Sequence, residues 1–351
     1  MSEVLLVSLG TTSGLRIADS LLVSMLREAG ASVEAIKVKL GAADRLRRGY
    51  PVNDLVEAIA ARRALAGALA RGARPRALLF STTTTALLAA PGGLPYAVRL
   101  DSPAALNRPG ARNAPVHALE RRSLARARLI VAFGEAGAGA LPAGSAPAEV
   151  VPVPIEPSGD IERTRDADLA VAYVPDPKAR GLDRLCAAWA EIAGDMSARR
   201  LEIFGIEPEL ARAFLARHRL REPPGVTFRG FVSRETFRSA LRAACCFVSA
   251  TGWEDFGVAP LEALCDGALL VTTPAHGPYE ALALARALDP ELIARDLESG
   301  SLAIAIRAAY ARDHGTRAGY RARAAACLEP YRWDAAVITL RAHVLPALLG
   351  R

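Results

Sequence analysis

Apolar runs with little polar alternation recur along the chain and predict strands that are buried on both faces. Between these runs lie segments with apolar residues at helical spacing. One example is the predicted helix 17–28, which Gly30 terminates. The predicted strands are 4–9, 32–38, 77–80, 96–100, 129–133, 169–174, 201–204, 226–231, 245–250 and 268–272. Parallel sheets covered by helices on both faces have this pattern. The sequence therefore predicts an α/β protein with doubly wound, Rossmann-like sheets.

A segment rich in Pro, Gly and Ala interrupts this alternation at residues 142–159. Interdomain linkers have this composition, and 351 residues are enough for two substantial cores. We expect a first domain over 1–156, a second over 157–330, and a terminal helix over 331–351 that begins near Trp333.

The richest chemistry lies between the strands 245–250 and 268–272. There Glu254 falls in a loop and Glu262 in the helix that follows, with Pro260 acceptable in its first turn. Gly257 leaves room for a ligand at the positive end of this helix. The stretch predicts a site for an anionic ligand with hydroxyl groups, although two solvated glutamates near a helix start are an alternative.

Two segments of the first domain that directly follow predicted strands are also candidate ligand sites. The turn 10–14, Gly-Thr-Thr-Ser-Gly, lacks the G-x-G-x-x-G spacing, so a dinucleotide site is not supported, but its backbone N–H groups suit a phosphate or a sugar. A plain tight turn is the alternative. Five hydroxyl residues at 81–85 lie where doubly wound sheets bind ligands, and helix capping is the alternative there.

Composition narrows the class of protein. Apolar residues make up 51% and charged residues 23%, no apolar run is long enough to cross a membrane, and the N-terminus enters a strand without a signal segment. Five cysteines in apolar contexts form no C-x-x-C pair, which indicates reduced core residues and no metal site. We expect a cytoplasmic protein.

Charge is placed unevenly along the chain. Residues 1–156 carry 19 basic and 12 acidic side chains, whereas the remainder carries 25 of each. A basic first half suits an anionic partner, such as a phospholipid surface or a lipid-phosphate acceptor, and suits nucleic acid less well. The clearest basic patch joins Arg45, Arg47 and Arg48 to Tyr50. A solvated basic face is the alternative.

The pattern E-x7-E, with Phe-Gly two residues after the first Glu, resembles the donor-site signature of retaining GT-B glycosyltransferases of family 4. The resemblance extends to the glycine loop 275–280, the V-x-F-x-G strand 226–230 and the basic-Gly pair Arg180-Gly181. It covers roughly 169–280 well and the first domain in outline. It implies two Rossmann-like domains facing across a cleft, with the terminal helix crossing back to the first domain.

The function implied is transfer of a sugar from a nucleotide-diphosphate sugar to an acceptor hydroxyl with retention, by a hexosyltransferase-type enzyme. By resemblance Arg180 meets the donor's diphosphate, with Lys178 as a second cation, Glu262 holds the ribose and Glu254 the transferred sugar. A planar guanidinium matches phosphate oxygens well. No metal-binding D-x-D motif is needed because fixed cations replace the ion, so no cofactor is expected.

The remaining candidates follow from the same comparison. Further donor-binding candidates are Phe256, Gly257, Val258, Gly230, Gly277 and Gly14. Many family members place a histidine near the loop that follows 96–100, but here the strand ends at Asp101 and the nearest histidine is His117. These two residues and Thr12 are the acceptor-side candidates.

Two other readings of the same fold stay open. A nucleotide-sugar epimerase needs acid and base residues in the cleft, and the sequence offers no clear set. A binding module that lost catalysis is a different class, against which the intact pair Glu254 and Glu262 argues. The expected partners are a nucleotide sugar, a glycan, lipid-linked or small-molecule acceptor, and a weak contact with an anionic membrane, but no nucleic acid.

Overall fold

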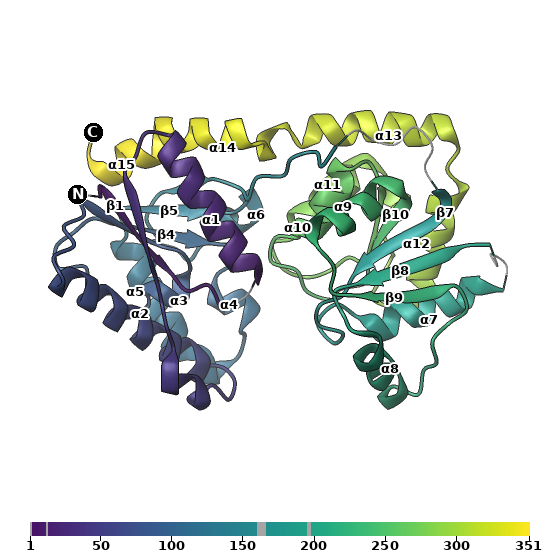
Figure 1. Ribbon diagram of the computed structural model, residues 1–351, viewed down its shortest axis with the longest axis horizontal. Coiled ribbons are helices and arrows are strands. Elements are labelled where there is room, and N and C mark those ends of the chain that lie inside the picture. The colour runs from purple at the N-terminus through teal and green to yellow at the C-terminus, as the bar shows by residue number, and fades with distance from the viewer. Residues whose placement is uncertain (1, 12, 160–165, 195–197) are drawn as a thin grey trace. The chain divides into compact units, whose positions relative to one another are not determined.

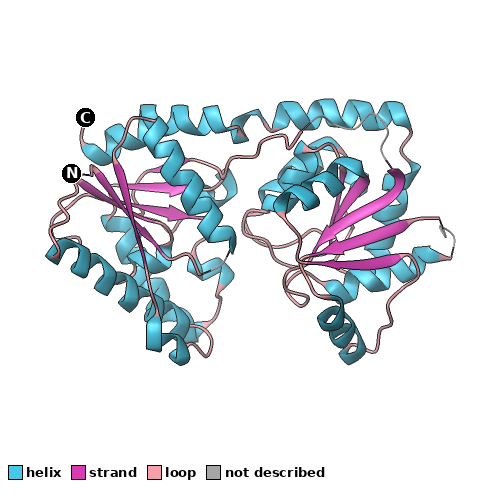
Figure 2. Ribbon diagram, in the orientation of Figure 1, coloured by secondary structure: helices cyan, strands magenta, loops and turns pink. Residues whose placement is uncertain are grey.

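The computed structural model describes residues 2–11, 13–159, 166–194 and 198–351 (Figure 1). The chain forms two compact units, of which the first comprises Met1–Pro154 together with Tyr331–Arg351, and the second Ile155–Pro330. Both are α/β units with a parallel sheet covered by helices (Figure 2). These are the Rossmann-like sheets that the apolar runs predict.

The sheet of the first domain has six parallel strands in the order β2-β1-β3-β4-β5-β6. They are β1(Val4–Ser8), β2(Val33–Lys37), β3(Ala77–Phe80), β4(Tyr96–Leu100), β5(Leu129–Ala132) and β6(Ala148–Val150). Its helices are α1(Ser13–Glu28), α2(Val52–Ala70), α3(Thr83–Ala86), α4(Ala104–Asn107), α5(Ala114–Arg126) and α6(Glu135–Gly139). The strand β1 is entirely buried, as its unbroken apolar run requires.

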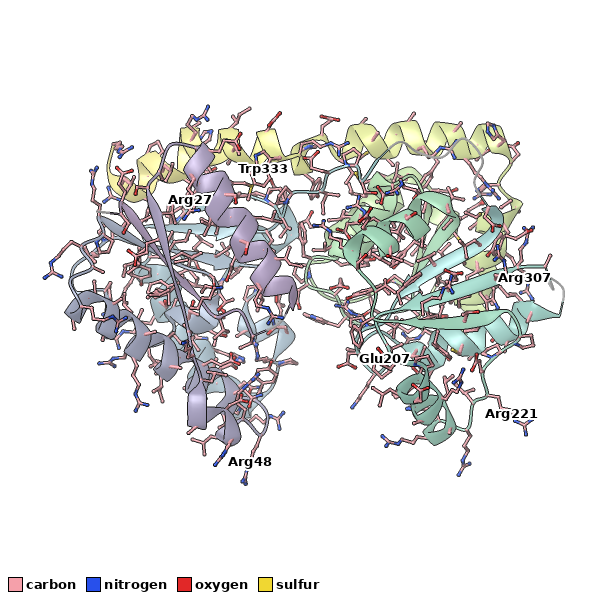
Figure 3. All side chains as sticks on the ribbon, viewed as in Figure 1. Arg27, Arg48, Glu207, Arg221, Arg307 and Trp333 are labelled. Carbon is pink, nitrogen blue, oxygen red and sulfur yellow. The ribbon has the colours of Figure 1, made fainter. Side chains whose placement is uncertain are left out.

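The last segment of the chain completes the first domain. It comprises α14(Trp333–Thr339), a π-helical turn η5(Leu340–Val344) and α15(Leu345–Leu349). Leu340, Val344 and Leu348 share one core with β1 and α1. Trp333, which Figure 3 labels, also donates from Nε1 to Glu28 Oε2 at 2.8 Å. The predicted return of the terminal helix to the first domain is thereby confirmed.

The sheet of the second domain has five strands in the order β11-β10-β7-β8-β9, all parallel. They are β7(Asp166–Tyr173), β8(Arg200–Phe204), β9(Val226–Gly230), β10(Ala244–Ser249) and β11(Leu269–Thr272). The helices are α7(Leu182–Ala193), α8(Pro208–Arg217), α9(Arg234–Ala243), α10(Val258–Cys265), α11(Glu280–Leu288), α12(Ser299–Ala311) and α13(His314–Cys327).

Several predicted boundaries are wrong. The helix α1 begins at Ser13 rather than Ile17. The segment 119–122, Leu-Glu-Arg-Arg, predicts the start of a helix, but α5 begins five residues earlier, at Ala114. Asn53 is a residue type that favours a helix N-cap, and the sequence predicts a helix start there. However, α2 begins one residue earlier, at Val52, and the Asn53 side chain accepts a hydrogen bond from the Gly49 N–H at 3.0 Å. Among the described residues, no helix is both long and apolar enough to cross a bilayer.

Candidate functional site

The order of the strands locates a ligand site in the second domain. The chain builds β7, β8 and β9 outward in one direction, then returns to place β10 on the other side of β7. In an open parallel sheet, ligands bind beyond the carboxyl ends of the strands at such a reversal. The two loops at this point follow β7 and β10, and they carry Arg180 and Glu254.

Arg180 and Glu254 meet in this structure. The guanidinium Nη1 donates to Glu254 Oε2, and the two residues come from loops 74 positions apart. The Glu254 side chain is only 12% exposed. Burial raises its pKa, and the neighbouring Arg180 charge opposes that rise. The Arg180 charge therefore favours the ionised form of Glu254, against the effect of burial.

Close backbone packing fixes these loops. Gly181 precedes α7 with φ +64°, and a Cβ there would lie 2.2 Å from the Ala250 carbonyl oxygen. Gly277 has φ +101°, and a Cβ there would lie 2.3 Å from the Glu254 carbonyl oxygen. Only glycine fits either position. The Glu254 N–H in turn donates to the His276 carbonyl at 2.9 Å. The backbone of Glu254 is therefore fixed at its N–H by His276 and at its carbonyl by close contact with Gly277.

Glu262 lies in α10 and is buried beside two arginines of α9. Its Oε1 accepts from Arg234 Nη2 at 2.5 Å, from Arg234 Nε at 3.1 Å and from Arg238 Nη1 at 3.3 Å. Tyr173, at the end of β7, lies near enough to both Glu262 and Arg180 to feel their charges. Burial raises the Tyr173 pKa, the Glu262 charge raises it further, and Arg180 lowers it.

The other donor-side candidates occupy different settings. Phe256 is buried and Val258 is 38% exposed, and they flank Gly257, the residue that precedes α10. Gly230 ends β9 next to the Glu207 carboxylate, which Figure 3 labels. Lys178 is exposed and makes no ion pair with the residues that the structure describes. Lys178 is therefore available to an anionic ligand.

The first-domain candidates are less concentrated. Asp101 follows β4 and accepts from the Ser102 N–H at 2.7 Å, while His117 lies on α5 with Nε2 3.0 Å from the Arg108 carbonyl oxygen. Gly14 is exposed in the first turn of α1. Thr12 lies outside the described residues.

The hydroxyl residues after β3 are engaged within the protein. Thr82 and Thr85 form a reciprocal capping box at the start of α3, and Thr84 donates to Asp54 at 3.2 Å. Ser81 Oγ accepts from the Leu9 N–H at 3.1 Å. Helix capping, the alternative at this segment, is the reading that the contacts support.

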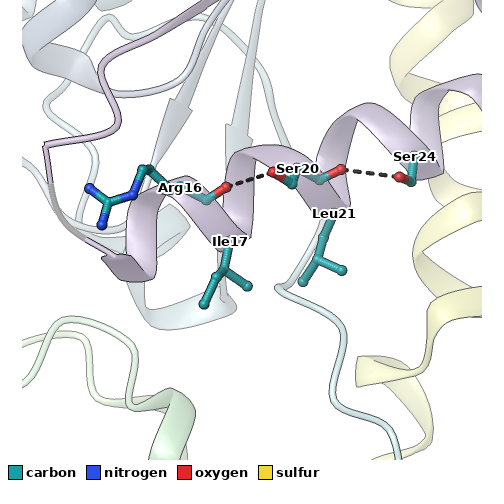
Figure 4. Close-up of a pocket in the computed structure, with 5 residues that line it drawn as sticks. All are labelled: Arg16, Ile17, Ser20, Leu21 and Ser24. Carbon is teal, nitrogen blue, oxygen red and sulfur yellow. Dashed lines mark hydrogen bonds between the residues drawn. The ribbon is translucent and has the colours of Figure 1, made fainter. Parts of the chain in front are cut away.

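A shallow hollow runs along the exposed face of α1 (Figure 4). Its lining consists of Arg16, Ile17, Ser20, Leu21 and Ser24, and none of these is a predicted site residue. Both serines donate to carbonyl groups one turn earlier in the same helix. The hollow therefore adds no polar group with an obvious catalytic use.

Sequence reasoning missed several site residues. Arg234, Arg238 and Tyr173 have no motif of their own, although Tyr173 ends the strand at the topological switch point, a signal that could have identified it. The first domain has a similar switch point between β1 and β3. There burial raises the pKa of Asp19, whose carboxylate accepts from Ser8 Oγ at 2.5 Å.

Comparison with known proteins assigns a family to the second domain. Residues 169–311, which contain both loops and Glu262, match the family model described as Glycosyl transferases group 1. The matched residues, which lie in the second domain, belong to this family. The chain is a glycosyltransferase that uses a nucleotide-sugar donor. No curated protein matches the chain by sequence.

Solved structures extend the likeness of this glycosyltransferase to its whole fold. The sucrose-phosphate synthase of Thermosynechococcus elongatus has 17% identity, a TM-score of 0.71 and 97% coverage of both chains. A UDP-forming alpha,alpha-trehalose-phosphate synthase of Burkholderia xenovorans has 14% identity, a TM-score of 0.73 and 99% coverage of both.

A third likeness is to WaaG, a glycosyltransferase involved in lipopolysaccharide biosynthesis, with 14% identity and a TM-score of 0.68. The match covers 95% of this chain and 98% of WaaG. At these identities the three structures establish the shared GT-B fold and nothing finer.

Proposed function

We propose that this glycosyltransferase binds a nucleotide-diphosphate sugar in its second domain and transfers the sugar, with retention, to an acceptor hydroxyl. The observation that carries the proposal is the meeting of Arg180 and Glu254 at the switch point, with Glu262 in the helix that follows Glu254. A cation for the diphosphate and two carboxylates for hydroxyl groups are what such a donor needs.

Arg180 and Lys178 would stabilise the diphosphate as it leaves. Negative charge grows on the leaving group during bond cleavage, and preorganised cations lower the barrier most at that stage. Arg180 uses Nη1 for Glu254, so its other N–H groups can meet phosphate oxygens without breaking this pair. We therefore propose catalysis without a divalent metal ion.

Glu262 would hold the donor's ribose. The hydrogen bonds that described residues donate to its side chain all reach Oε1. Oε2 can then accept from ribose hydroxyls, which donate well to a carboxylate. Glu254, held by Arg180 and by the backbone around Gly277, would bind hydroxyls of the transferred sugar.

We further propose an anionic acceptor, or an acceptor on an anionic surface. The first domain, Met1–Pro154 with Tyr331–Arg351, carries 22 Lys and Arg against 12 Asp and Glu, a net charge of +10. The second carries 22 against 25, a net charge of −3. A field of this sign attracts anions to the first domain.

Nucleotide binding to the purified protein tests the donor assignment. Thermal shifts with UDP, ADP, GDP and dTDP identify the nucleotide, with UDP first because one structural relative is UDP-forming. Glu262→Ala and Arg180→Ala should each weaken binding of that nucleotide by about 1.5–3 kcal/mol in calorimetry.

Matched controls are available on α8, where Glu209 and Arg217 are exposed. Glu209→Ala and Arg217→Ala should leave the affinity unchanged. Absence of binding by the wild-type protein to all four nucleotides would contradict the proposed function. Unchanged affinity in both site variants would contradict only the residue assignment.

A further inference from the structure

Glu262 is joined to a buried ionic network whose other members have no place in the proposed chemistry. Arg238, on α9, lies between Glu262 and Asp266, the residue after α10. Arg238 Nη2 also donates to the Glu156 carbonyl at 2.8 Å. Ser158 completes the network, because its N–H and Oγ donate to Asp266 Oδ1 at 3.2 and 3.0 Å.

The guanidinium of Arg238 is used on both edges. Nε and Nη2 form a bidentate pair with the Asp266 carboxylate at 2.5 and 2.8 Å, and Nη1 reaches Glu262 Oε1 at 3.3 Å. This geometry requires a planar fork with donors on two edges. A lysine ammonium has one donor centre and cannot span both carboxylates.

Burial separates Arg238 from the second arginine that contacts Glu262. The Arg238 side chain is 4% exposed and that of Asp266 is 0% exposed, whereas that of Arg234 is 50% exposed. Burial alone would lower the Arg238 pKa, but the hydrogen bonds with Asp266 and the Glu262 charge raise it overall. Water screens the contact between Arg234 and Glu262 and can replace it. Water cannot replace the buried contact between Arg238 and Glu262.

We propose that Arg238 is a positioning residue for the donor site, which fixes Glu262 by tying its Oε1 to Asp266. The inference rests on the proposed role of Glu262 in ribose binding. With Oε1 held by Arg238, the carboxylate cannot rotate freely, and Oε2 keeps one orientation toward the ligand. Asp266 sets the orientation of Arg238 and thus acts one step further from the donor.

Calorimetry of the full-length protein with the nucleotide selected among UDP, ADP, GDP and dTDP tests this role. Arg238→Lys should weaken binding about tenfold, the loss expected from one charged hydrogen bond. Arg217→Lys, at an exposed position of α8 outside this network, is the control and should leave the affinity unchanged.

A double-mutant cycle distinguishes positioning from a general structural effect. If Arg238 acts through Glu262, then Arg238→Lys combined with Glu262→Gln should bind no more weakly than Glu262→Gln alone. Additive losses would overturn the proposal, as would wild-type affinity in Arg238→Lys. If Arg238→Lys does not fold, Asp266→Asn, which preserves shape, takes its place in the same cycle.

Failure of this inference differs from failure of the proposed function. If the wild-type protein binds none of the four nucleotides, both are wrong. If the wild-type protein binds and Glu262→Gln weakens binding, but neither Arg238→Lys nor Asp266→Asn does, only the positioning role is wrong.

Discussion

At the residue scale, the fold keeps Glu254 in a setting that costs stability. Its carboxylate is mostly buried, and burial raises its pKa despite the Arg180 charge beside it. Retaining a charged group that the core would exclude is typical of functional positions. A test of Glu254 can therefore separate its effect on stability from its effect on sugar transfer.

Glu254→Gln should abolish most transfer without loss of stability at pH 8. Between the ordinary pKa of 4.5 and the raised value, the native state binds more protons than the unfolded state. Wild-type stability therefore falls as pH rises through that window, and the glutamine variant should lack this fall. We expect a rate loss of about 100-fold or more, measured as initial rates.

Urea unfolding from pH 5 to 8 provides the stability measurement, with Glu209→Gln as an exposed control. Arg180 loses its partner in the variant, but its side chain is one-third exposed, so water compensates for most of that loss. An identical dependence on pH in the wild-type and Glu254→Gln proteins would refute the raised pKa.

At the scale of elements, the strands follow closely from sequence and the helix starts do not. β3, β4 and β11 have apolar runs with sharp edges, which predicted their positions to within one residue. Helix starts depend on which residue caps the helix, and the Asn53 side chain accepts from the Gly49 N–H instead of capping α2. Arg238 escaped prediction because its role depends on Asp266 and Glu156, contacts that only the tertiary structure brings together.

Gly277→Ala should destabilise the second domain by about 2 kcal/mol or more, because an alanine there must adopt φ +101° and crowd a carbonyl oxygen. Gly252→Ala is the matched control in the loop after β10. Within 4 Å of a Cβ at Gly252, the described part of the chain places only Leu297, at an ordinary 3.8 Å. Denaturant unfolding of both variants compares the two, and equal stability would show that the loop yields easily.

At the scale of the whole molecule, the first domain is discontinuous in sequence. The chain leaves it after Pro154 and returns at Tyr331, so its core is complete only with the last residues. Arg341 Nη2 donates to the Glu28 carbonyl at 2.9 Å, and Leu340 is fully buried. The final 21 residues, Tyr331–Arg351, are thus a structural part of the first domain rather than a tail.

Leu340→Ala should destabilise the first domain by about 2–5 kcal/mol, the usual loss for a large-to-small change in a core. Ile338, two residues earlier, is 62% exposed and offers the matched control. Ile338→Ala should change stability by less than about 0.5 kcal/mol. Thermal unfolding monitored by circular dichroism measures both, and similar effects of the two changes would mean that the terminal helix does not pack as described.

The charge contrast between the domains leads to the last prediction, that the first domain binds anionic surfaces weakly. The structure removes Arg47 from the candidate basic patch of residues 45–48. Arg47 pairs with the buried Glu57 at 3.0 Å and with Asp44 at 3.3 Å. Tyr50 stacks against Arg108. Arg45 and Arg48 remain exposed, and the Arg48 side chain extends away from the ribbon in Figure 3.

Arg45→Ser with Arg48→Ser should reduce co-sedimentation with vesicles of anionic phospholipid. At about 1 kcal/mol for each basic residue near such a surface, the loss is roughly 2 kcal/mol. Binding by the wild-type protein should also fall in 0.5 M salt, since the Debye length is then only about 4 Å. Arg217→Ser with Arg221→Ser, in the second domain, removes the same charge elsewhere and should have no effect. Equal sedimentation of the two double variants would mean that net charge, and not this patch, governs binding, and no sedimentation of the wild-type protein would favour a soluble acceptor.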